Sequence, residues 1–273
     1  MKYHIEKNSV QETLVIPLYG RKICMDKYPD LFYDKYCNEL LSKLDWNFEA
    51  WSKKIPIFGA LEAGMRQYDL CCEVEDYLKD HPRACVVNLG CGLDTTFAQI
   101  DNGLVKGYNL DKADVIDIRN QLLPPKTREY NIACDLTNTK WFEQIDFNKE
   151  DGVVFIAGGV FYYFKRDEVK SLFCQMAQYF TGGRLSFDTT TALGLKMMMK
   201  TVIKESGIDV GAYFSVNNLH KEISPWSDKI TRVVRKKYMT GYRKPDRRLG
   251  IVNRTLSYIA DWTKLCQIAQ ITF

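Results

Sequence analysis

The segment VVNLGCGLDTTF places two glycines, Gly90 and Gly92, on either side of Cys91. The apolar run from Ala84 to Leu89 leads into it and has the composition of a strand buried on both faces of a parallel sheet. A short helix is expected from about Thr95. Because glycine lacks a Cβ, this turn lets the backbone approach a ligand closely at the carboxyl end of the strand. The order of strand, glycine turn and helix therefore predicts a cofactor site.

Two carboxylates stand at the ends of the next two predicted strands. Asp111 follows the strand Val105 to Leu110, about 20 residues after the glycine turn, which is the spacing of a carboxylate that accepts the hydroxyl hydrogens of a ribose. Asp135, followed by Leu136, ends the strand Tyr130 to Cys134, a natural place to meet an adenine amino group. Each aspartate could instead cap the helix that follows it, since aspartate is a preferred N-cap.

Two classes of cofactor fit such a turn. A dinucleotide requires a third glycine for close packing of helix on strand, and this sequence has Thr95 there. S-Adenosylmethionine carries no phosphate and makes less demand on the start of the helix. The sequence therefore favours S-adenosylmethionine over NAD(P), and a methyltransferase over an oxidoreductase.

The elements that must position these residues alternate between strand and helix. Beyond the three strands above, the apolar pattern predicts further elements in the core: a helix at Lys112–Leu123, a short helix at Asn138–Ile145, a strand at Asp151–Ala157, a helix at Arg166–Phe180 and a strand at Arg184–Asp188. This alternation predicts an α/β fold with a Rossmann-like, mostly parallel, doubly wound sheet.

The two ends of the chain have weaker patterns. A long helix is expected at Gly59–Lys79, and residues 11–58 look helical, most clearly Asp30–Leu44. After the core, residues 190–206 are expected to be helical, residues 230–243 to form a strand or an irregular helix, and Cys266–Phe273 to form a final strand. We therefore expect a helical extension (1–82), a cofactor-binding core (83–189), a cap or lid (190–230) and a C-terminal segment that completes the sheet (231–273).

Composition narrows the possible partners. The chain has 273 residues, a hydrophobic fraction of 46% and a net charge of +4, which is too small to indicate nucleic-acid binding. It has neither the apolar stretch of a signal peptide at its start nor an apolar run of the roughly 20 residues that span a membrane. The nine cysteines are scattered without a CxxC pair, and the three histidines lie far apart. We expect a cytoplasmic protein that binds no metal, nucleic acid or membrane.

NLGCGLDTTF, the aspartate of YNLDKADVIDIR, and ACDL followed by FIAGGVFYYF resemble the leucine carboxyl methyltransferase family, and more closely its branch of polyketide-synthesis O-methyltransferases. The resemblance includes LVIPLYGRKICMDKYPDLF and weakens after about residue 190. It implies a class I methyltransferase sheet with an N-terminal helical extension, a cap inserted late in the chain, and S-adenosylmethionine as the donor.

The resemblance also assigns roles by position. Gly90 and Gly92, with Cys91 between them, would contact the methionine portion of the donor; Asp111 would bind its ribose, and Asp135 with Leu136 would flank its adenine.

A family arginine that grips the donor's carboxylate falls on Arg66, and Arg21 is a second basic candidate for the same group. A guanidinium suits bidentate binding of a carboxylate. The alternative for Arg66 is an ion pair with Glu62, one helical turn away.

One position departs from the family pattern. Leucine carboxyl methyltransferases have a glutamate just after the fourth strand, where this sequence has Gly158. The departure argues against the phosphatase C-terminal leucine as substrate and favours a small-molecule acceptor with a carboxylate or hydroxyl. There are two alternatives: an enzyme that methylates a protein C-terminus, and a non-catalytic protein that binds S-adenosylmethionine.

The acceptor side has fewer signals, because methyl transfer needs mainly alignment, and only a phenol acceptor needs a base. Tyr162, Tyr163 and His220 are candidates for contact with the acceptor, and Asp188 is another. Each has a structural alternative: packing for the tyrosines, a surface position for the histidine, and the start of the next helix for Asp188. The basic stretch Lys229–Arg248 is expected to form a solvated face, with attraction of an anionic substrate or RNA as alternatives.

Overall fold

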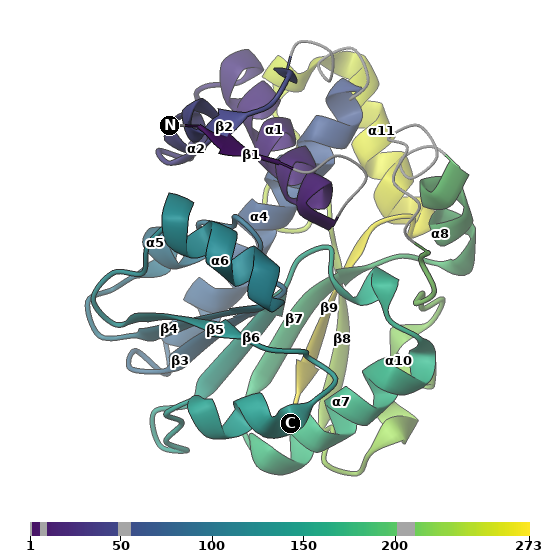
Figure 1. Ribbon diagram of the computed structural model, residues 1–273. Helices are drawn as coiled ribbons and strands as arrows, with labels where there is room; N and C mark the ends of the chain where they lie inside the picture. Colours follow the sequence, from purple (N-terminus) through teal and green to yellow (C-terminus); the bar gives the residue numbers. More distant parts are fainter. Residues whose placement is uncertain (1, 6–9, 49–55, 201–210) are drawn as a thin grey trace.

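A seven-stranded sheet, ordered β5-β4-β3-β6-β7-β9-β8, forms the centre of the protein (Figure 1). The computed structural model describes residues 2–5, 10–48, 56–200 and 211–273. The strands are β3 (Cys85–Leu89), β4 (Lys106–Asp111), β5 (Glu129–Ala133), β6 (Val153–Ala157), β7 (Arg184–Thr189), β8 (Arg232–Lys237) and β9 (Gln267–Thr272). All pairings from β5 through β7 are parallel, and β9 runs antiparallel to both β7 and β8. The predicted α/β class and its mostly parallel sheet are confirmed.

The strand order reverses between β3 and β6. From β3 the chain adds β4 and β5 on one side, and it then returns to add β6 and β7 on the other. Leu89 of β3 pairs with Leu110 of β4 and with Ala157 of β6, so these strands end in register at one edge of the sheet. A doubly wound sheet binds its ligand in the crevice at such a reversal. The glycine turn after Leu89 lies there.

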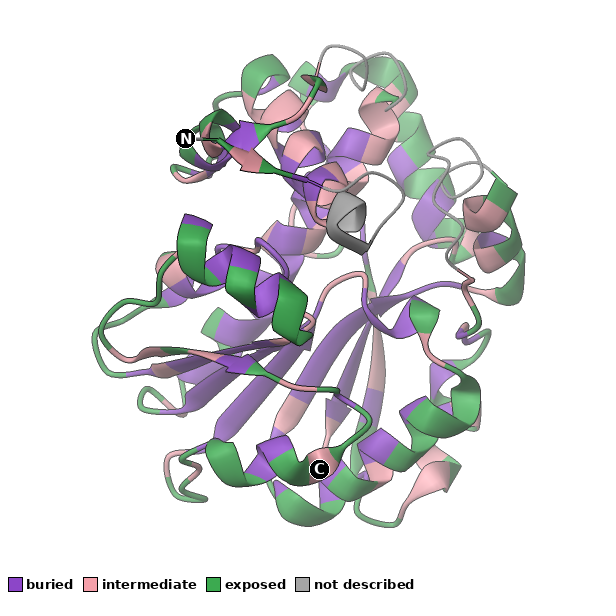
Figure 2. Ribbon diagram, in the orientation of Figure 1, coloured by how far each residue is buried: buried purple, intermediate pink, exposed green. Residues whose placement is uncertain are grey.

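Successive residues of each strand point to opposite sides of the sheet, so each face carries its own set of side chains. Helices cover both sets. Val87 and Phe155 belong to the core beneath α7 (Arg166–Tyr179) and η1 (Thr139–Gln144). Val86 and Val154 belong to the opposite core, beneath α4 (Ile57–Leu78). The five inner strands are buried along most of their length, the edge strands β5 and β8 are largely intermediate or exposed, and the helices are exposed on their outward sides (Figure 2).

The N-terminal region packs over one end of the sheet. Helix α1 (Val10–Lys27) packs against α4 and against α2 (Cys37–Lys43), in the upper part of Figure 1. A two-stranded parallel sheet, β1 (Tyr3–His4) with β2 (Leu44–Asp45), joins the two ends of this region. Within the described residues, no helix is both long and apolar enough to cross a membrane.

The remaining helices follow the core strands or close the C-terminal part. They are α5 (Thr96–Ile100), α6 (Ala113–Leu122), η2 (Phe161–Tyr163), α8 (Ala192–Met198), α10 (Leu219–Ile223), η4 (Ser224–Trp226), η5 (Arg247–Leu249) and α11 (Gly250–Thr263). The ambiguous stretch 230–243 contains the strand β8. Of the helix expected at 190–206, the part after residue 200 lies outside the described residues.

Two expectations for helices are wrong. The stretch expected to be the clearest N-terminal helix, Asp30–Leu44, is helical only in α2, because the carboxylate of Asp34 accepts a hydrogen bond from Tyr36 N at 3.0 Å and holds a turn there. Helix α11 was not predicted. It begins without a side-chain N-cap, at Gly250 with φ +75°, so the usual signals of a helix start are missing.

The interpretation of Lys229–Arg248 as a solvated face holds for most of its Lys and Arg side chains, which are exposed, but it is wrong for Arg235, Lys236 and Arg243. Lys236 pairs with the buried Glu73, and Arg235 donates to the carbonyl oxygen of Asp261 at 2.6 Å. Arg243 donates to the carbonyl oxygen of Leu31 at 2.8 Å and lies over the ring of Tyr68. These cations join the C-terminal segment to the core and to the N-terminal region.

Helix α4 carries an unusual buried polar face toward β7, β8 and β9. Glu73, with no exposed surface, accepts hydrogen bonds from Ser186 Oγ and Gln270 Nε2, both at 2.6 Å. Asp69 is equally buried, but neither of its carboxyl oxygens has a hydrogen-bond partner among the described residues. Burial, and then the nearby carboxylates of Asp261 and Glu73, raise the pKa of Asp69 well above 3.8. Asp69 is therefore more stable as the neutral acid in the folded protein.

This raised pKa predicts a pH-dependent penalty. The folded state retains the proton of Asp69 at pH values where the unfolded state has lost it, so the free energy of unfolding falls as pH rises from 3.8 through the folded pKa. We expect Asp69→Asn to remove this dependence. Within that pH window, the free energy of unfolding of the variant should rise relative to that of the wild type by up to about 1.4 kcal/mol per pH unit. Urea unfolding at a series of pH values measures this difference. Asp80→Asn, an exposed position just beyond α4, is the control. Parallel curves for wild type and Asp69→Asn would contradict the assignment.

Candidate cofactor and active site

The glycine turn after β3 has a backbone that only glycine adopts easily. Gly90 has φ +63° and Gly92 has φ +47°, both in the left-handed region. A Cβ on Gly90 would lie 2.5 Å from Cγ2 of Val160, in the loop after β6. Cys91, which lies between the glycines, is buried, and its backbone N–H donates to the carbonyl oxygen of Leu110 at 3.0 Å. The turn therefore brings the ends of β3, β4 and β6 together.

Asp111 lies against this turn at the end of β4. Its Oδ2 accepts the backbone N–H of Gly92 at 2.8 Å, and its Oδ1 accepts the backbone N–H of Lys112 at 2.8 Å. Burial raises the pKa of Asp111, whereas these two hydrogen bonds favour the ionised form. The N-cap of α6 is Lys112, so Asp111 does not occupy the capping position that was its alternative. A carboxylate has about four lone-pair sites, so two remain for ligand hydroxyls.

Arg119 of α6 donates hydrogen bonds to the backbone of the glycine turn, a role that the sequence analysis did not predict. Its Nη1 donates to the carbonyl oxygens of Gly92 at 2.9 Å and Asp94 at 2.8 Å, and its Nη2 lies 3.4 Å from Glu129 Oε1. The side chain is almost fully buried. An arginine near the end of a helix normally suggests a solvated residue beside the helix C-terminus, so the sequence offers no signal for this role.

Asp135 and Leu136, both predicted to flank the adenine, lie in different environments in the structure. Asp135 is exposed beyond the end of β5, where its Oδ1 accepts hydrogen bonds from the backbone N–H and the hydroxyl of Thr137, which lower its pKa. It does not cap η1, whose N-cap is Asn138. Leu136 is buried in the core, and its carbonyl oxygen accepts from Trp141 Nε1 at 3.3 Å. Asp135 therefore lies on the rim of the sheet, and the side chain of Leu136 lies inside.

Arg21 reaches the glycine turn from α1 through a buried polar cluster. Its Nη1 lies 3.0 Å from Asp34 Oδ2 and donates to Gln67 Oε1 at 2.5 Å, and its Nη2 donates to the carbonyl oxygen of Leu93 at 3.2 Å. The hydroxyl of Thr95 donates to Asp34 at 3.1 Å and accepts from Gln67 Nε2 at 3.0 Å. Thr95 occupies the position where a dinucleotide site needs glycine, and here its hydroxyl joins the N-terminal region to the cofactor loop.

Arg66 lies on α4 and pairs with Asp188 at the end of β7, with Nη1 3.2 Å from Oδ2. The alternative ion pair with Glu62 is not the one formed, since Glu62 Oε1 lies 3.0 Å from the thiol of Cys266. Asp188 also accepts the backbone N–H of Gly159 at 2.6 Å and the hydroxyl of Tyr162 at 3.2 Å. Asp188 therefore belongs to the site and does not start the next helix, whose N-cap is Thr191.

The remaining candidates differ in their surroundings. Tyr162 is buried, and burial followed by the charge of Asp188 raises its pKa well above 10, so its hydroxyl is a donor to Asp188 and no base at neutral pH. Tyr163 is 39% exposed beside the same cluster, and partial desolvation by its surroundings raises its pKa. His220 is exposed on α10, which packs against β8, and the contacts that define the Arg66–Asp188 cluster do not involve it.

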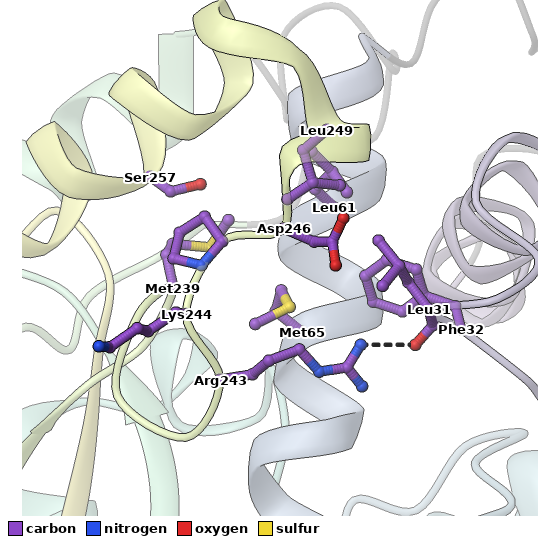
Figure 3. A pocket seen from close by; sticks show the side chains of 11 residues that line it. Leu31, Phe32, Leu61, Met65, Met239, Arg243, Lys244, Asp246, Leu249 and Ser257 are labelled. Carbon is purple, nitrogen blue, oxygen red and sulfur yellow. Dashed lines mark hydrogen bonds between the residues drawn. The ribbon is translucent and has the colours of Figure 1, made fainter.

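A separate hollow lies between α4, α11 and the loop that follows β8 (Figure 3). Apolar side chains such as Leu61, Met65 and Met239 line it, with Arg243 across its side, donating to the carbonyl oxygen of Leu31. The residues predicted to bind the donor are not among those that line it. The site at the ends of β3, β4, β6 and β7 is therefore defined by its polar contacts and not by this hollow.

Comparisons with known proteins agree with this sheet and turn. A putative methyltransferase from Thermobifida fusca has a similar structure, with a TM-score of 0.59, 12% identity, and coverage of 97% of this chain and 99% of the other. The chain is 25% identical over 185 residues, 67% of each protein, to the tetracenomycin polyketide synthesis O-methyltransferase TcmP of Streptomyces glaucescens. It is 25% identical over 205 residues, 68% of each protein, to the S-adenosyl-L-methionine-dependent methyltransferase dpfgK of Gibberella zeae.

The fold and these relatives together define a class I methyltransferase that uses S-adenosylmethionine. The sequence profile described as Leucine carboxyl methyltransferase matches residues 22–177, more than half of the chain. The protein belongs to the leucine carboxyl methyltransferase family.

The geometry of the glycine turn leads to a direct test. In Gly90→Ala, the new methyl group meets Val160 and the residue must adopt a positive φ, so the turn has to shift. We expect the affinity for S-adenosylhomocysteine to fall about tenfold or more, equivalent to ~1.4 kcal/mol, by calorimetric titration. Gly103→Ala is the control, because Gly103 has φ +85° but no atom within 4 Å of the added Cβ. It should show only the left-handed penalty of about 1–2 kcal/mol in stability. Equal affinities for Gly90→Ala and wild type would refute the role of the turn.

Proposed function

We propose that this protein transfers the methyl group of S-adenosylmethionine to a carboxylate or hydroxyl oxygen of a small molecule. The hydrogen bond between Gly92 N and Asp111 Oδ2, at the reversal of strand order, carries the proposal. It places a carboxylate with free lone pairs beside a turn whose backbone only glycine allows. The O-methyltransferase activity in the name of the Streptomyces glaucescens relative supports an oxygen acceptor and a small molecule.

The residues present fit the donor. The turn Gly90-Cys91-Gly92 would accommodate its amino-acid portion, and Asp111 would accept hydrogen bonds from its ribose. Arg66 would bind its carboxylate, since the bond to Asp188 uses one of the five N–H groups of a guanidinium. Asp135, exposed at the end of β5, would accept from its adenine amino group.

The donor contributes a methyl group already activated by a positive sulfonium sulfur. The protein then has to align the acceptor oxygen and exclude water. A carboxylate acceptor is ionised at neutral pH and needs no base, which agrees with the absence of a free base in the described cluster of Arg66, Tyr162 and Asp188. Tyr163, partly exposed beside this cluster, is the side chain we propose to contact the acceptor.

The parts of the proposed cap (190–230) that the structure describes, residues 190–200 and 211–230, would lie beside the acceptor. The backbone N–H groups of Tyr213 and Phe214 donate to the carbonyl oxygen of Tyr162, at 2.7 and 3.2 Å, so this segment is joined to the loop after β6. Phe214 is buried against the core.

We place the protein in the cytoplasm, in keeping with its nine cysteines, all of them free thiols.

Calorimetric titration of S-adenosylmethionine and, separately, NADPH tests the proposal. We expect the wild type to bind S-adenosylmethionine and not NADPH, and Asp111→Ala to lose at least about tenfold in affinity because the ribose loses its acceptor. Asp117→Ala, an exposed aspartate on the neighbouring helix α6, is the matched control and should bind as the wild type does.

In a second experiment, methyl transfer to aromatic carboxylic acids and phenols is measured by mass spectrometry. Binding of NADPH in place of S-adenosylmethionine would overturn the proposal in favour of an oxidoreductase. Binding of the donor without methylation of any acceptor would favour the non-catalytic alternative.

A further inference from the structure

Asp188 forms three interactions with three different parts of the chain. Its Oδ1 accepts the backbone N–H of Gly159 at 2.6 Å, and its Oδ2 accepts from Arg66 Nη1 and from the hydroxyl of Tyr162, each at 3.2 Å. The side chain is only 3% exposed. One carboxylate at the end of β7 therefore holds α4, the loop after β6 and the start of η2 in a fixed relation.

Gly159, the second glycine after β6, leaves room for the guanidinium of Arg66, and Gly158 lies in contact with the same side chain. A Cβ on Gly159, which has φ +76°, would lie 2.7 Å from Arg66 Nη1. A Cβ on Gly158 would lie 3.5 Å from Arg66 Nε and 3.1 Å from Leu70 Cδ1. The arginine therefore lies directly against this backbone. The position after β6 provides no charge of its own, and the countercharge comes from Asp188 on the neighbouring strand.

The pairing has an electrostatic reason. The side chain of Arg66 is only 20% exposed, and a largely buried guanidinium is unfavourable without a countercharge. The buried carboxylate of Asp188, 3.2 Å from Arg66 Nη1, provides that countercharge. Fixing the planar guanidinium by one ion pair leaves its other N–H groups in a defined orientation, which lowers the entropy lost when a second carboxylate binds.

We propose that Asp188 is a positioning residue for donor binding: it orients Arg66 over Gly158 and Gly159 so that the guanidinium binds the carboxylate of the donor. The inference rests on the proposed function. In it, Asp188 acts through Arg66 and does not contact the reacting atoms. It implies that the loss of Asp188 affects only ligands that carry the amino-acid portion of the donor.

The test compares two ligands. S-Adenosylhomocysteine carries the amino-acid portion and 5′-methylthioadenosine lacks it. We expect Asp188→Asn, which keeps an acceptor for Gly159 but removes the charge, to weaken S-adenosylhomocysteine about tenfold by calorimetry while 5′-methylthioadenosine binds as in the wild type. The matched control is Asp76→Asn, because Asp76 of α4 pairs with Arg184 at the start of β7, 2.9 Å apart. It removes an ion pair between the same two elements, away from the site, and both ligands should bind unchanged.

Each other result overturns the inference in a distinguishable way. Equal loss for both ligands in Asp188→Asn means that Asp188 has only a structural role. No loss for either means that Arg66 does not depend on it. If the wild type binds neither ligand, the proposed function fails as well. If Asp188→Asn does not fold, Tyr162→Phe replaces it, because it removes one of the three bonds to Asp188. We then expect a loss of about threefold for S-adenosylhomocysteine alone, and unchanged binding overturns the inference.

Discussion

The polar face that α4 turns toward the sheet is the constraint on which most of the structure depends. A helix that buries Asp69 and Glu73, and partly buries Glu62 and Arg66, needs partners from elsewhere, since buried charges are tolerated only when they are paired or neutralised. Ser186, Gln270 and Lys236 supply them for Glu73, and Asp188 supplies one for Arg66. These partners come from β7, β8 and β9, so the C-terminal strands are specified by hydrogen bonds to the helix as well as by apolar packing.

The cofactor turn shows the same dependence on distant parts of the chain. Asp111 and Arg119 hold Gly92 from two directions, through its backbone N–H and its carbonyl oxygen. On the other side, Arg21 and Thr95 connect the turn to α1. The N-terminal extension is therefore part of the site, because its hydrogen bonds help to fix the backbone against which the donor is proposed to lie.

The departure at Gly158 has a physical explanation in this arrangement. A Cβ on Gly158 would lie 3.1 Å from Leu70 Cδ1 and 3.5 Å from Arg66 Nε, so a side chain there would enter the space that Leu70 occupies beside the arginine. The negative charge is provided instead by Asp188, one strand away. A missing carboxylate at one position is thus no sign of a decayed site, because the charge that Arg66 requires is present in three dimensions.

The sequence by itself determined the parallel sheet, its order of strands and helices through β7, and the glycine turn with Asp111 beside it. These follow from local patterns: buried apolar runs, turn residues and spacing along the chain. Only the tertiary structure decided the partners of Arg66, the support that Arg119 gives the turn, the burial of Leu136 and the exposure of His220. It also decided that α11 is a helix and that three cations of 229–248, Arg235, Lys236 and Arg243, bind to other parts of the chain. The reason is that a charged side chain carries no sign of its partner, and that partner can lie far away in the sequence: 163 residues separate Glu73 from Lys236, and 218 separate Asp30 from Arg248.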